Sequence, residues 1–292
     1  MKNKIFDCIT FFKSNLLFEV RFNTLKNYVD YFVVCEGTKT HAGNNKKLNF
    51  NLNKWKKYKE KIIYIVDNDM PNLIISNKKR SSLFKFMTRK YGEDKWKLLK
   101  HQMERLHDGI KFANKNDLII FSDEDEIPNP NNISNFNFNK YKFGIFMQNL
   151  YYYKLNLQNN TEWNGLWPGS RICQKKNLKS FFDFRILDLS NTKKPFWRSV
   201  FKEKSIQPIY NGGWHFTYLM NENDISEKIK NSAHQEFNSK KYYDKNLIKK
   251  RIKSFLDPFE RDNENLLKKT IIDETYPDYI RDNILKLKKW IV

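Results

Sequence analysis

The chain has 292 residues, and its 54 Lys and Arg against 33 Asp and Glu give a formal net charge of +21. That length suits one large domain or two small ones, and 40% hydrophobic content with 16% aromatic residues excludes a disordered chain. The basic excess fits an anionic partner, such as nucleic acid, an acidic membrane surface or a phosphorylated substrate. Lysine is mixed with much asparagine, so compositional drift explains the excess equally well.

The three cysteines, Cys8, Cys35 and Cys173, are widely spaced and form no C-x-x-C pair. This pattern argues against a disulfide framework or a zinc site and favours a reducing compartment. No apolar run reaches the ~20 residues that a membrane span needs, and the N-terminus lacks the apolar core of a signal peptide. We therefore expect a cytoplasmic protein and leave a peripheral membrane contact open.

The first part of the chain alternates predicted strands and helices. In chain order, the patterns predict a strand at 4–10, a helix at 16–28, strands at 29–37 and 61–69, a helix at 93–113 and a strand at 117–123. This alternation is typical of a parallel sheet covered by helices. From about residue 141 the predicted strands are rich in aromatic residues, at 141–155, 167–174 and 194–201. The segment 208–219 then leads into helical patterns from Asp224 to the C-terminus.

The first predicted helix carries a charge within its apolar stripe. Arg21 projects between phenylalanines at helical spacing, and a buried guanidinium needs an acceptor. Glu36, at the end of the second strand, is one predicted partner. The alternative is that Arg21 extends along the edge of the stripe to solvent.

Four consecutive acids follow the strand at 117–123, from Asp123 to Glu126. In an open α/β sheet, ligands bind beyond the carboxyl ends of the strands. Residues two apart on an extended chain point the same way, so Asp123 and Asp125 can face one cation while Glu124 faces elsewhere. Carboxylate oxygens suit a Mg²⁺ or Mn²⁺ ion that also holds a diphosphate. An acidic turn or a helix N-cap is the alternative.

Two further motifs are rich in ligand-binding residue types. In "NGGWHFTY", the glycines allow close backbone approach or positive φ, and Trp214 offers a flat face to a sugar or base. His215 could bind a metal or phosphate, although a core histidine is the ordinary alternative. In "VCEGTKTHAGNNKK", a strand end leads into a polar loop whose lysines suit phosphate, or are simply solvated.

The segments "IFDCITFF", "VDYFVVCEGTKTHAG", "FSDEDEIP" and "GGWHFTY", in this order, closely resemble glycosyltransferase family 17 over roughly residues 4–240. That family includes the enzyme that adds the bisecting β-1,4-linked N-acetylglucosamine of N-glycans. The resemblance implies a GT-A type α/β fold with a Rossmann-like, mostly parallel sheet and flanking helices. Residues 1–128 would form the nucleotide-sugar-binding half of one domain, 129–240 its acceptor-side half, and 241–292 a C-terminal helical segment.

The resemblance also implies an inverting transfer from a nucleotide sugar, UDP-N-acetylglucosamine by family precedent, with Mn²⁺ or Mg²⁺ as cofactor. The implied metal ligands are Asp123, Asp125 and His215. The implied donor-binding residues are Glu36, Thr40, His41, Asp123, Asp125 and Trp214. The sequence departs from the family at Met103, where the family often has an arginine.

The sequence does not identify the general base or the acceptor. The candidate acids of the acceptor-side half are Asp183, Asp188, Asp224 and Glu236, of which Asp224 and Glu236 rank first because they lie near "GWHF". Acceptor sugars could stack on Trp163, Trp167 or Trp197, although core positions are the ordinary alternative. The sequence shows no membrane anchor like that of the animal enzyme, so we expect a glycan or surface-polysaccharide acceptor.

Two other function classes stay open at this point. A metal-dependent phosphodiesterase or nuclease would use Asp123, Asp125 and Glu126 as a metal cluster, but it needs a second acidic cluster and the chain offers none as dense. A non-catalytic basic binding module would explain the lysines and aromatics but not the acids at a strand end. Metal-dependent binding of a UDP-sugar would separate the three classes.

Overall fold

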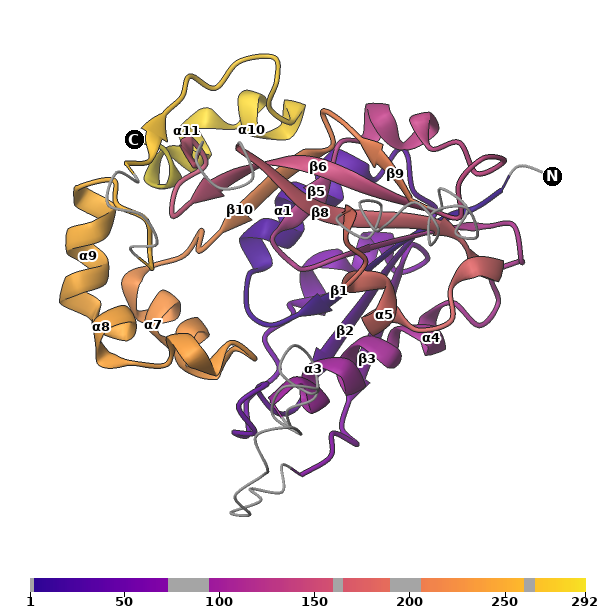
Figure 1. Ribbon diagram of the computed structural model, residues 1–292, viewed down its shortest axis with the longest axis horizontal. Coiled ribbons are helices and arrows are strands. Elements are labelled where there is room, and N and C mark those ends of the chain that lie inside the picture. Colours follow the sequence, from indigo (N-terminus) through magenta and orange to yellow (C-terminus); the bar gives the residue numbers. More distant parts are fainter. Residues whose placement is uncertain (1–2, 73–94, 160–164, 190–205, 260–265) are drawn as a thin grey trace, which may run out of the picture.

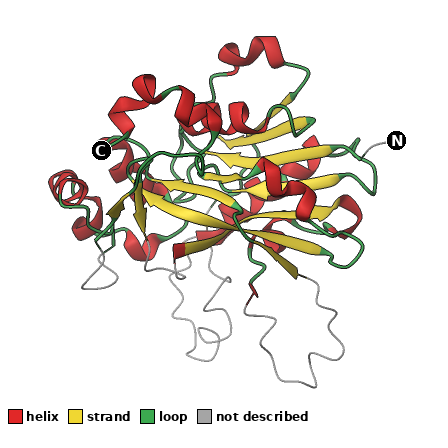
Figure 2. Cartoon of the chain, turned by 90° about the horizontal axis from the view of Figure 1, so that it is seen from above, coloured by secondary structure: helices red, strands yellow, loops and turns green. Residues whose placement is uncertain are grey.

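The computed structural model describes residues 3–72, 95–159, 165–189, 206–259 and 266–292 (Figure 1). Its centre is one mixed sheet with the strand order β11-β7-β6-β8-β4-β1-β2-β3. Strands β9 and β10 also pair with β6, and β5 pairs with β10. Helices lie on both sides of this sheet (Figure 2). The α/β class predicted from the sequence is therefore confirmed.

The described strands are β1 (Ile5–Phe11), β2 (Tyr31–Gly37), β3 (Ile62–Asp67), β4 (Leu118–Ser122), β5 (Glu126–Pro128), β6 (Phe143–Tyr152), β7 (Leu157–Asn159), β8 (Leu166–Gln174), β9 (Ile206–Ile209), β10 (Gly213–Thr217) and β11 (Lys268–Lys269). The described α-helices are α1 (Asn15–Leu25), α3 (Lys95–Glu104), α4 (Leu106–Gly109), α5 (Phe181–Arg185), α7 (Glu222–Asn231), α8 (Lys240–Tyr243), α9 (Lys245–Lys253), α10 (Asp278–Asp282) and α11 (Ile284–Leu287).

The parallel part of the sheet lies in the N-terminal half of the chain. Strand β1 pairs in parallel with both β2 and β4, and β2 pairs in parallel with β3, so the carboxyl ends of these four strands meet at one edge. The second half is mixed, because β8 runs antiparallel to both β4 and β6. The expectation of a mostly parallel sheet is confirmed by β4-β1-β2-β3 and by the parallel pairs that β6 makes with β9 and β10, while β8 and β7 add antiparallel pairs.

Alternating side chains of β1 serve two different cores. Phe6 and Cys8 pack in the cluster that includes α3 and α4, whereas Ile9 and Phe11 pack in the cluster that includes α1. Asp7 has the parity of Ile9 and is also fully buried on the α1 side. Strand β1 is thus covered on both faces, as expected for a central parallel strand.

Asp7 is the carboxylate that Arg21 needs. Arg21 Nε lies 3.3 Å from Asp7 Oδ2, and Arg21 Nη1 donates a 2.7 Å hydrogen bond to the carbonyl of Glu126. The predicted partner Glu36 is therefore wrong, and so is the solvent-exposed alternative, because Arg21 has no exposed surface. The hydrogen bond ties α1 to the backbone of the acidic segment.

The second half of the chain departs from the predicted elements in two places. The helix predicted at 93–113 is divided at Arg105 into α3 and α4. The C-terminal segment, predicted to be helical, also supplies β11, which pairs with β7. The strand predicted at 194–201, with Trp197, and the position of Trp163 lie outside the described residues.

Helices α7, α8 and α9 pack against one another at one side of the molecule, away from α3, α4 and α5 (Figure 1). Within the described ranges, none of the helices combines the length and the apolar character that crossing a membrane requires.

Candidate active site

A pocket of about 310 Å³ lies where β1, β2 and β4 end. Its walls come from these strand ends, from α3, α5 and α7 with the loop that follows α7, and from β6, β8 and β10. The polar and aromatic residues of its lining include Thr40, His41, Gln102, Asp123, Glu124, Asp125, Trp167, Arg185, His215, Tyr218, Lys228 and His234. The prediction that the acidic run lies at a ligand-binding sheet edge matches this position.

Asp123 lies in the pocket and is held by an arginine. Arg185 of α5 donates from Nε to Oδ1 at 3.1 Å and from Nη2 to Oδ2 at 2.7 Å, which is a bidentate contact. Burial opposes ionisation of Asp123, but Arg185 outweighs it and lowers the pKa of the carboxyl. Asp123 is therefore a carboxylate whose oxygens already face a fixed cation.

Asp125 lies in the same pocket with two cationic neighbours. Lys228 Nζ on α7 is 2.8 Å from Oδ2, and His215 Nε2 on β10 is 3.4 Å from Oδ1. Burial works against charge on all three groups, yet their mutual attraction lowers the pKa of Asp125 and raises those of His215 and Lys228. The site is thus built from charged groups of both signs.

The two glutamates of the acidic run turn to the protein instead. Glu124 Oε2 accepts a 2.9 Å hydrogen bond from the backbone N–H of Phe12, in the turn between β1 and α1. Glu126 accepts from Trp167 Nε1 at 2.8 Å and from the backbone N–H of Asp123 at 3.1 Å. Burial and the charge of Asp123 raise the pKa of Glu126. Asp123, Glu124 and Asp125 all line the pocket, and they do so from a turn that the Glu126 N–H closes on the Asp123 carbonyl at 3.1 Å. The extended stretch expected here is therefore corrected to the acidic turn that was the alternative.

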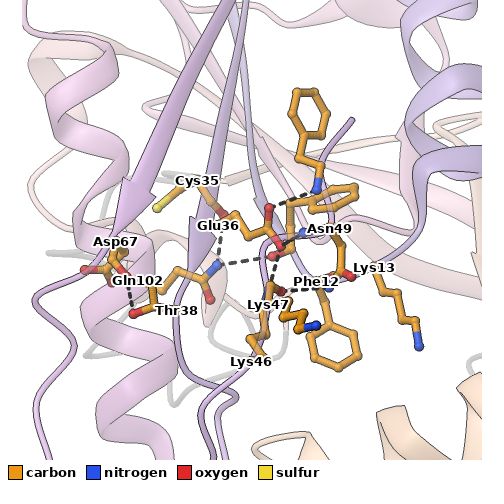
Figure 3. Close-up of polar contacts among 12 residues, drawn as sticks. Phe12, Lys13, Cys35, Glu36, Thr38, Lys46, Lys47, Asn49, Asp67 and Gln102 are labelled. Carbon is orange, nitrogen blue, oxygen red and sulfur yellow. Dashed lines mark hydrogen bonds and ion pairs between the residues drawn. The ribbon is translucent and has the colours of Figure 1, made fainter. Parts of the chain in front are cut away.

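Glu36 organises a loop and does not line the pocket (Figure 3). Its Oε1 accepts from Lys46 Nζ at 2.5 Å and from the Asn49 N–H at 2.6 Å. Its Oε2 accepts from the Phe50 N–H at 3.0 Å and from the Tyr64 hydroxyl at 2.8 Å. The expectation that Glu36 contacts the donor is corrected here, because this fully buried carboxylate is occupied by the protein.

His41 lies in the pocket in a defined tautomer. Gln102 of α3 donates from Nε2 to the carbonyl of Cys35 at 2.8 Å, so its Oε1 must be the acceptor that faces His41 Nε2 at 2.7 Å. His41 Nε2 therefore carries the proton, and Nδ1 is a bare acceptor in the neutral ring. Burial lowers the pKa of His41 and favours that neutral ring. Thr40 also lines the pocket, so both predicted residues of this loop are in place.

Trp214 does not reach the pocket, although its neighbour His215 does. Its ring packs in the core with Ile127 and Tyr151, and its Nε1 donates a 3.0 Å hydrogen bond to the carbonyl of Thr275. The predicted donor contact of Trp214 is thus corrected to a core position, because alternation along β10 sends Trp214 and His215 to opposite faces. Trp167, by contrast, lies in the pocket wall with its ring centroid 5.0 Å from that of His215.

Of the two predicted general bases, neither lines the pocket itself. Asp224 lies in the first turn of α7, where it accepts a 2.7 Å hydrogen bond from Asn221 Nδ2 and forms an ion pair with Lys13 Nζ at 2.6 Å. Glu236 is exposed, but its Oε1 lies 2.7 Å from Nδ1 of His234, which does line the pocket. His234 therefore lies at the pocket wall, and Glu236 lies behind it as its ion-pair partner.

Some of the carboxylate oxygens in the site are suitable ligands for a hard divalent cation. Within the described ranges, no group of three or more His, Cys, Asp or Glu side chains is arranged to hold a metal. Asp123 and Asp125 offer the oxygens that Mg²⁺ or Mn²⁺ prefers, and a diphosphate with water would complete such a shell. His215 Nδ1 and Glu124 Oε1 are buried without a hydrogen-bond partner among the described residues, which leaves polar capacity beside the aspartates.

Comparison with known proteins decides the family. The model of glycosyltransferase family 17 matches residues 1–164, which is more than half of the chain. The chain belongs to glycosyltransferase family 17. It is thus a glycosyltransferase, as the resemblance of its motifs predicted, and the nuclease and binding-module readings are set aside.

Two other comparisons add less to the family 17 assignment. No curated protein matches the chain. Among solved structures, a crystal structure of 4-diphosphocytidyl-2C-methyl-D-erythritol synthase matches with 10% identity and a TM-score of 0.34, over 60% of this chain and 77% of that one. So distant a likeness carries no argument about the family 17 site.

Several pocket residues of this family 17 chain were not predicted from its sequence. Arg185 ends an aromatic segment, and Lys228 is one of many lysines on a polar helix. His234 lies two residues before Glu236, the predicted general base. No local pattern distinguishes Arg185 or Lys228, because each acquires its role from a carboxylate far away in the sequence. His234 could have been found by giving weight to a histidine two residues from a candidate acid.

Proposed function

We propose that the protein transfers N-acetylglucosamine from UDP-N-acetylglucosamine to a glycan or surface-polysaccharide hydroxyl, with inversion and with Mn²⁺ or Mg²⁺ as cofactor. The observation that carries this proposal is the pair Asp123 and Asp125, which lie at the end of a parallel strand in a pocket lined also by Arg185 and Lys228. Such a set can hold a cation through its carboxylates and a diphosphate through its cations.

Each group then has a defined part in the reaction. Asp123 and Asp125 would hold the metal, which would supply positive charge to stabilise the leaving diphosphate. The hydroxyl oxygen of the acceptor forms the new bond to the anomeric carbon, while the bond from that carbon to the diphosphate oxygen breaks. His41 Nδ1, a fixed acceptor, takes a hydrogen bond from an N–H or O–H of the donor.

The proton of the acceptor hydroxyl needs a base at the pocket wall. We assign it to His234, because Glu236 at 2.7 Å from Nδ1 leaves the other ring nitrogen to take the proton. A carboxylate behind the ring also stabilises the imidazolium that forms. Glu236 is then a positioning residue, which modifies its predicted role as the base.

The experiment that tests the function is calorimetric titration of UDP-N-acetylglucosamine, UDP-glucose, UDP-galactose and UDP, with Mn²⁺ and with chelator. We expect binding only with metal and a preference for UDP-N-acetylglucosamine. Asp123→Asn and Asp125→Asn should each weaken that binding by a factor of about 100, since each removes a charged ligand of the metal. Asp282→Asn, at an exposed position outside the pocket, is the matched control.

Metal-independent binding, or unchanged binding in both variants, would contradict the proposed use of the aspartates. A preference for another sugar would correct the donor and keep the metal site. No binding of any UDP-sugar under either condition would overturn the proposed donor class.

A further inference from the structure

The two aspartates of the pocket are fully engaged by cations of the protein itself. Asp123 takes the Arg185 fork through both of its oxygens, and Asp125 takes Lys228 at 2.8 Å. These contacts are shielded: the side chains of Arg185 and Lys228 are 21% and 19% exposed. A divalent cation that binds the same carboxylate oxygens must therefore compete with Arg185 and Lys228.

The energetic cost of that competition depends on where the displaced cations go. An isolated charge in a shielded site is unfavourable, and breaking a buried ion pair is strongly destabilising when the second charge finds no new partner. Both cations are held in ion pairs with these carboxylates, at 2.7 Å for Arg185 and 2.8 Å for Lys228. Metal alone would take their nearest counter-ions from Arg185 and Lys228 and leave Lys228 with the more distant Glu124, at 3.6 Å.

The charges of the pocket balance in a way that suits an exchange. Three acids, Asp123, Glu124 and Asp125, face four Lys and Arg side chains: Lys39, Lys46, Arg185 and Lys228. A divalent cation together with a nucleoside diphosphate sugar adds charges of opposite sign that nearly cancel. Either of them alone would leave the site out of balance.

Resting on the proposed function, we propose that Arg185 and Lys228 are resident counter-ions that pass from Asp123 and Asp125 to the diphosphate when donor and metal enter together. The guanidinium fork of Arg185 matches two phosphate oxygens as well as it matches a carboxylate. Lys228 needs only a short movement, since its flexible stem already lies between Asp125, Glu124 at 3.6 Å and the ring of Tyr218.

This exchange makes metal and donor binding strongly cooperative. Metal that binds with diphosphate lets the displaced cations re-pair, whereas metal that binds alone does not. Because the coupling is reciprocal, diphosphate also binds poorly without metal. Arg185 and Lys228 thus hold the empty site in a state that rejects free metal.

The test measures binding of Mn²⁺ alone and of UDP with and without Mn²⁺, by electron paramagnetic resonance and calorimetry. In Arg185→Met and Lys228→Met, we expect Mn²⁺ alone to bind about ten-fold more tightly, because its competitor is gone, and UDP with Mn²⁺ to bind about ten-fold more weakly. Lys230→Met, which removes the same charge from the same helix outside the pocket, should change neither quantity.

A merely structural role for these cations gives a different pattern, in which both binding steps weaken together. That result, or unchanged Mn²⁺ affinity in both variants, would overturn the exchange. If a methionine variant does not fold, Arg185→Lys keeps the charge and loses the fork, and it should show the same opposite changes to a smaller degree.

Failure of the proposed function is distinguishable from failure of the exchange. If no UDP-sugar or UDP binds the wild type, the donor assignment fails. The Mn²⁺-only measurement still decides whether Arg185 and Lys228 guard the aspartates, because it needs no nucleotide.

Discussion

At the residue scale, the acidic run shows how one short sequence can serve two purposes. Asp123 and Asp125 face the pocket, whereas Glu124 and Glu126 accept hydrogen bonds from backbone N–H groups and Trp167. The two aspartates are therefore the residues to which we assign the metal in the proposed function, while the glutamates hold the turn after β4 against its neighbours. This division explains why a chain of net charge +21 keeps four acids together.

The His234–Glu236 pair gives a prediction at the same scale. His234→Gln should reduce the rate of UDP release from UDP-N-acetylglucosamine by a factor of about 100 or more, because the base is lost. Metal-dependent donor binding should be retained, since the aspartates are untouched. Glu236→Gln should cause a smaller loss of rate, because glutamine still accepts the Nδ1 proton but does not stabilise the imidazolium.

The control for this prediction is His101→Gln, since His101 pairs with Asp67 and does not line the pocket. Equal loss of donor binding and of rate in His234→Gln would assign His234 to the donor site. Full activity in His234→Gln would place the base elsewhere.

At the element scale, α5 is short and depends on another helix for its position. Glu104, at the end of α3, accepts from the Ser180 hydroxyl at 2.6 Å and from the Phe182 N–H at 3.1 Å, at the first turn of α5. Arg185 is the last residue of α5. Glu104 therefore fixes the helix that brings Arg185 to Asp123.

The pKa of Glu104 gives the pH dependence of this contact. Burial opposes ionisation, but hydrogen bonds from His107, Ser180 and Phe182 lower the pKa to about 2 from the usual 4.5. The contact therefore stabilises the fold above about pH 4.5, and its contribution is lost as the pH falls towards 2. We expect Glu104→Gln to lower the free energy of unfolding by about 1–2 kcal/mol at pH 7.

Urea unfolding of wild type and Glu104→Gln over this pH range measures the effect. The difference between them should be constant at neutral pH and shrink below about pH 4.5. Glu60→Gln, at a side chain that is 88% exposed, is the control and should show no such difference. A Glu104→Gln difference that is the same at pH 7 and at low pH would contradict the ionic origin of the contact.

At the scale of the whole molecule, one buried side chain contributes several of the contacts that join the C-terminal segment to the sheet. Asn156, which is buried, donates from Nδ2 to the carbonyls of Thr270 at 3.1 Å and Val292 at 3.0 Å. Its Oδ1 accepts from the Val292 N–H at 3.0 Å. Strand β11 continues the same connection by pairing with β7.

We therefore expect Asn156→Ala to destabilise the entire fold. It leaves three backbone groups without their partner, and we expect a loss of about 3 kcal/mol in the free energy of unfolding. Urea unfolding followed by tryptophan fluorescence and by far-ultraviolet circular dichroism measures it. The two signals should still coincide in one transition, because one sheet connects the N- and C-terminal parts.

Asn246→Ala, at an exposed position of α9, provides the control for this substitution. Two separate transitions in Asn156→Ala would contradict the view that the C-terminal segment unfolds with the sheet. A loss no larger than that of the control would show that Asn156 is not the main attachment.

The sequence by itself determined the α/β class, the parallel order of the first strands, the family and the pocket-facing aspartates. The class and the parallel strands follow from short-range periodicity, and the position of the aspartates follows from the rule that ligands bind at the carboxyl ends of parallel strands. The family follows from the resemblance of four ordered motifs.

Only the tertiary structure decided which partner each charged group takes. Arg21 meets Asp7, Glu36 meets its own loop, and Arg185 meets Asp123 across 62 positions of sequence. Trp214 enters the core although its neighbour His215 enters the pocket. The physical reason is that the energy of an ion pair depends on distance and burial in space, and no local pattern among so many lysines and asparagines encodes either.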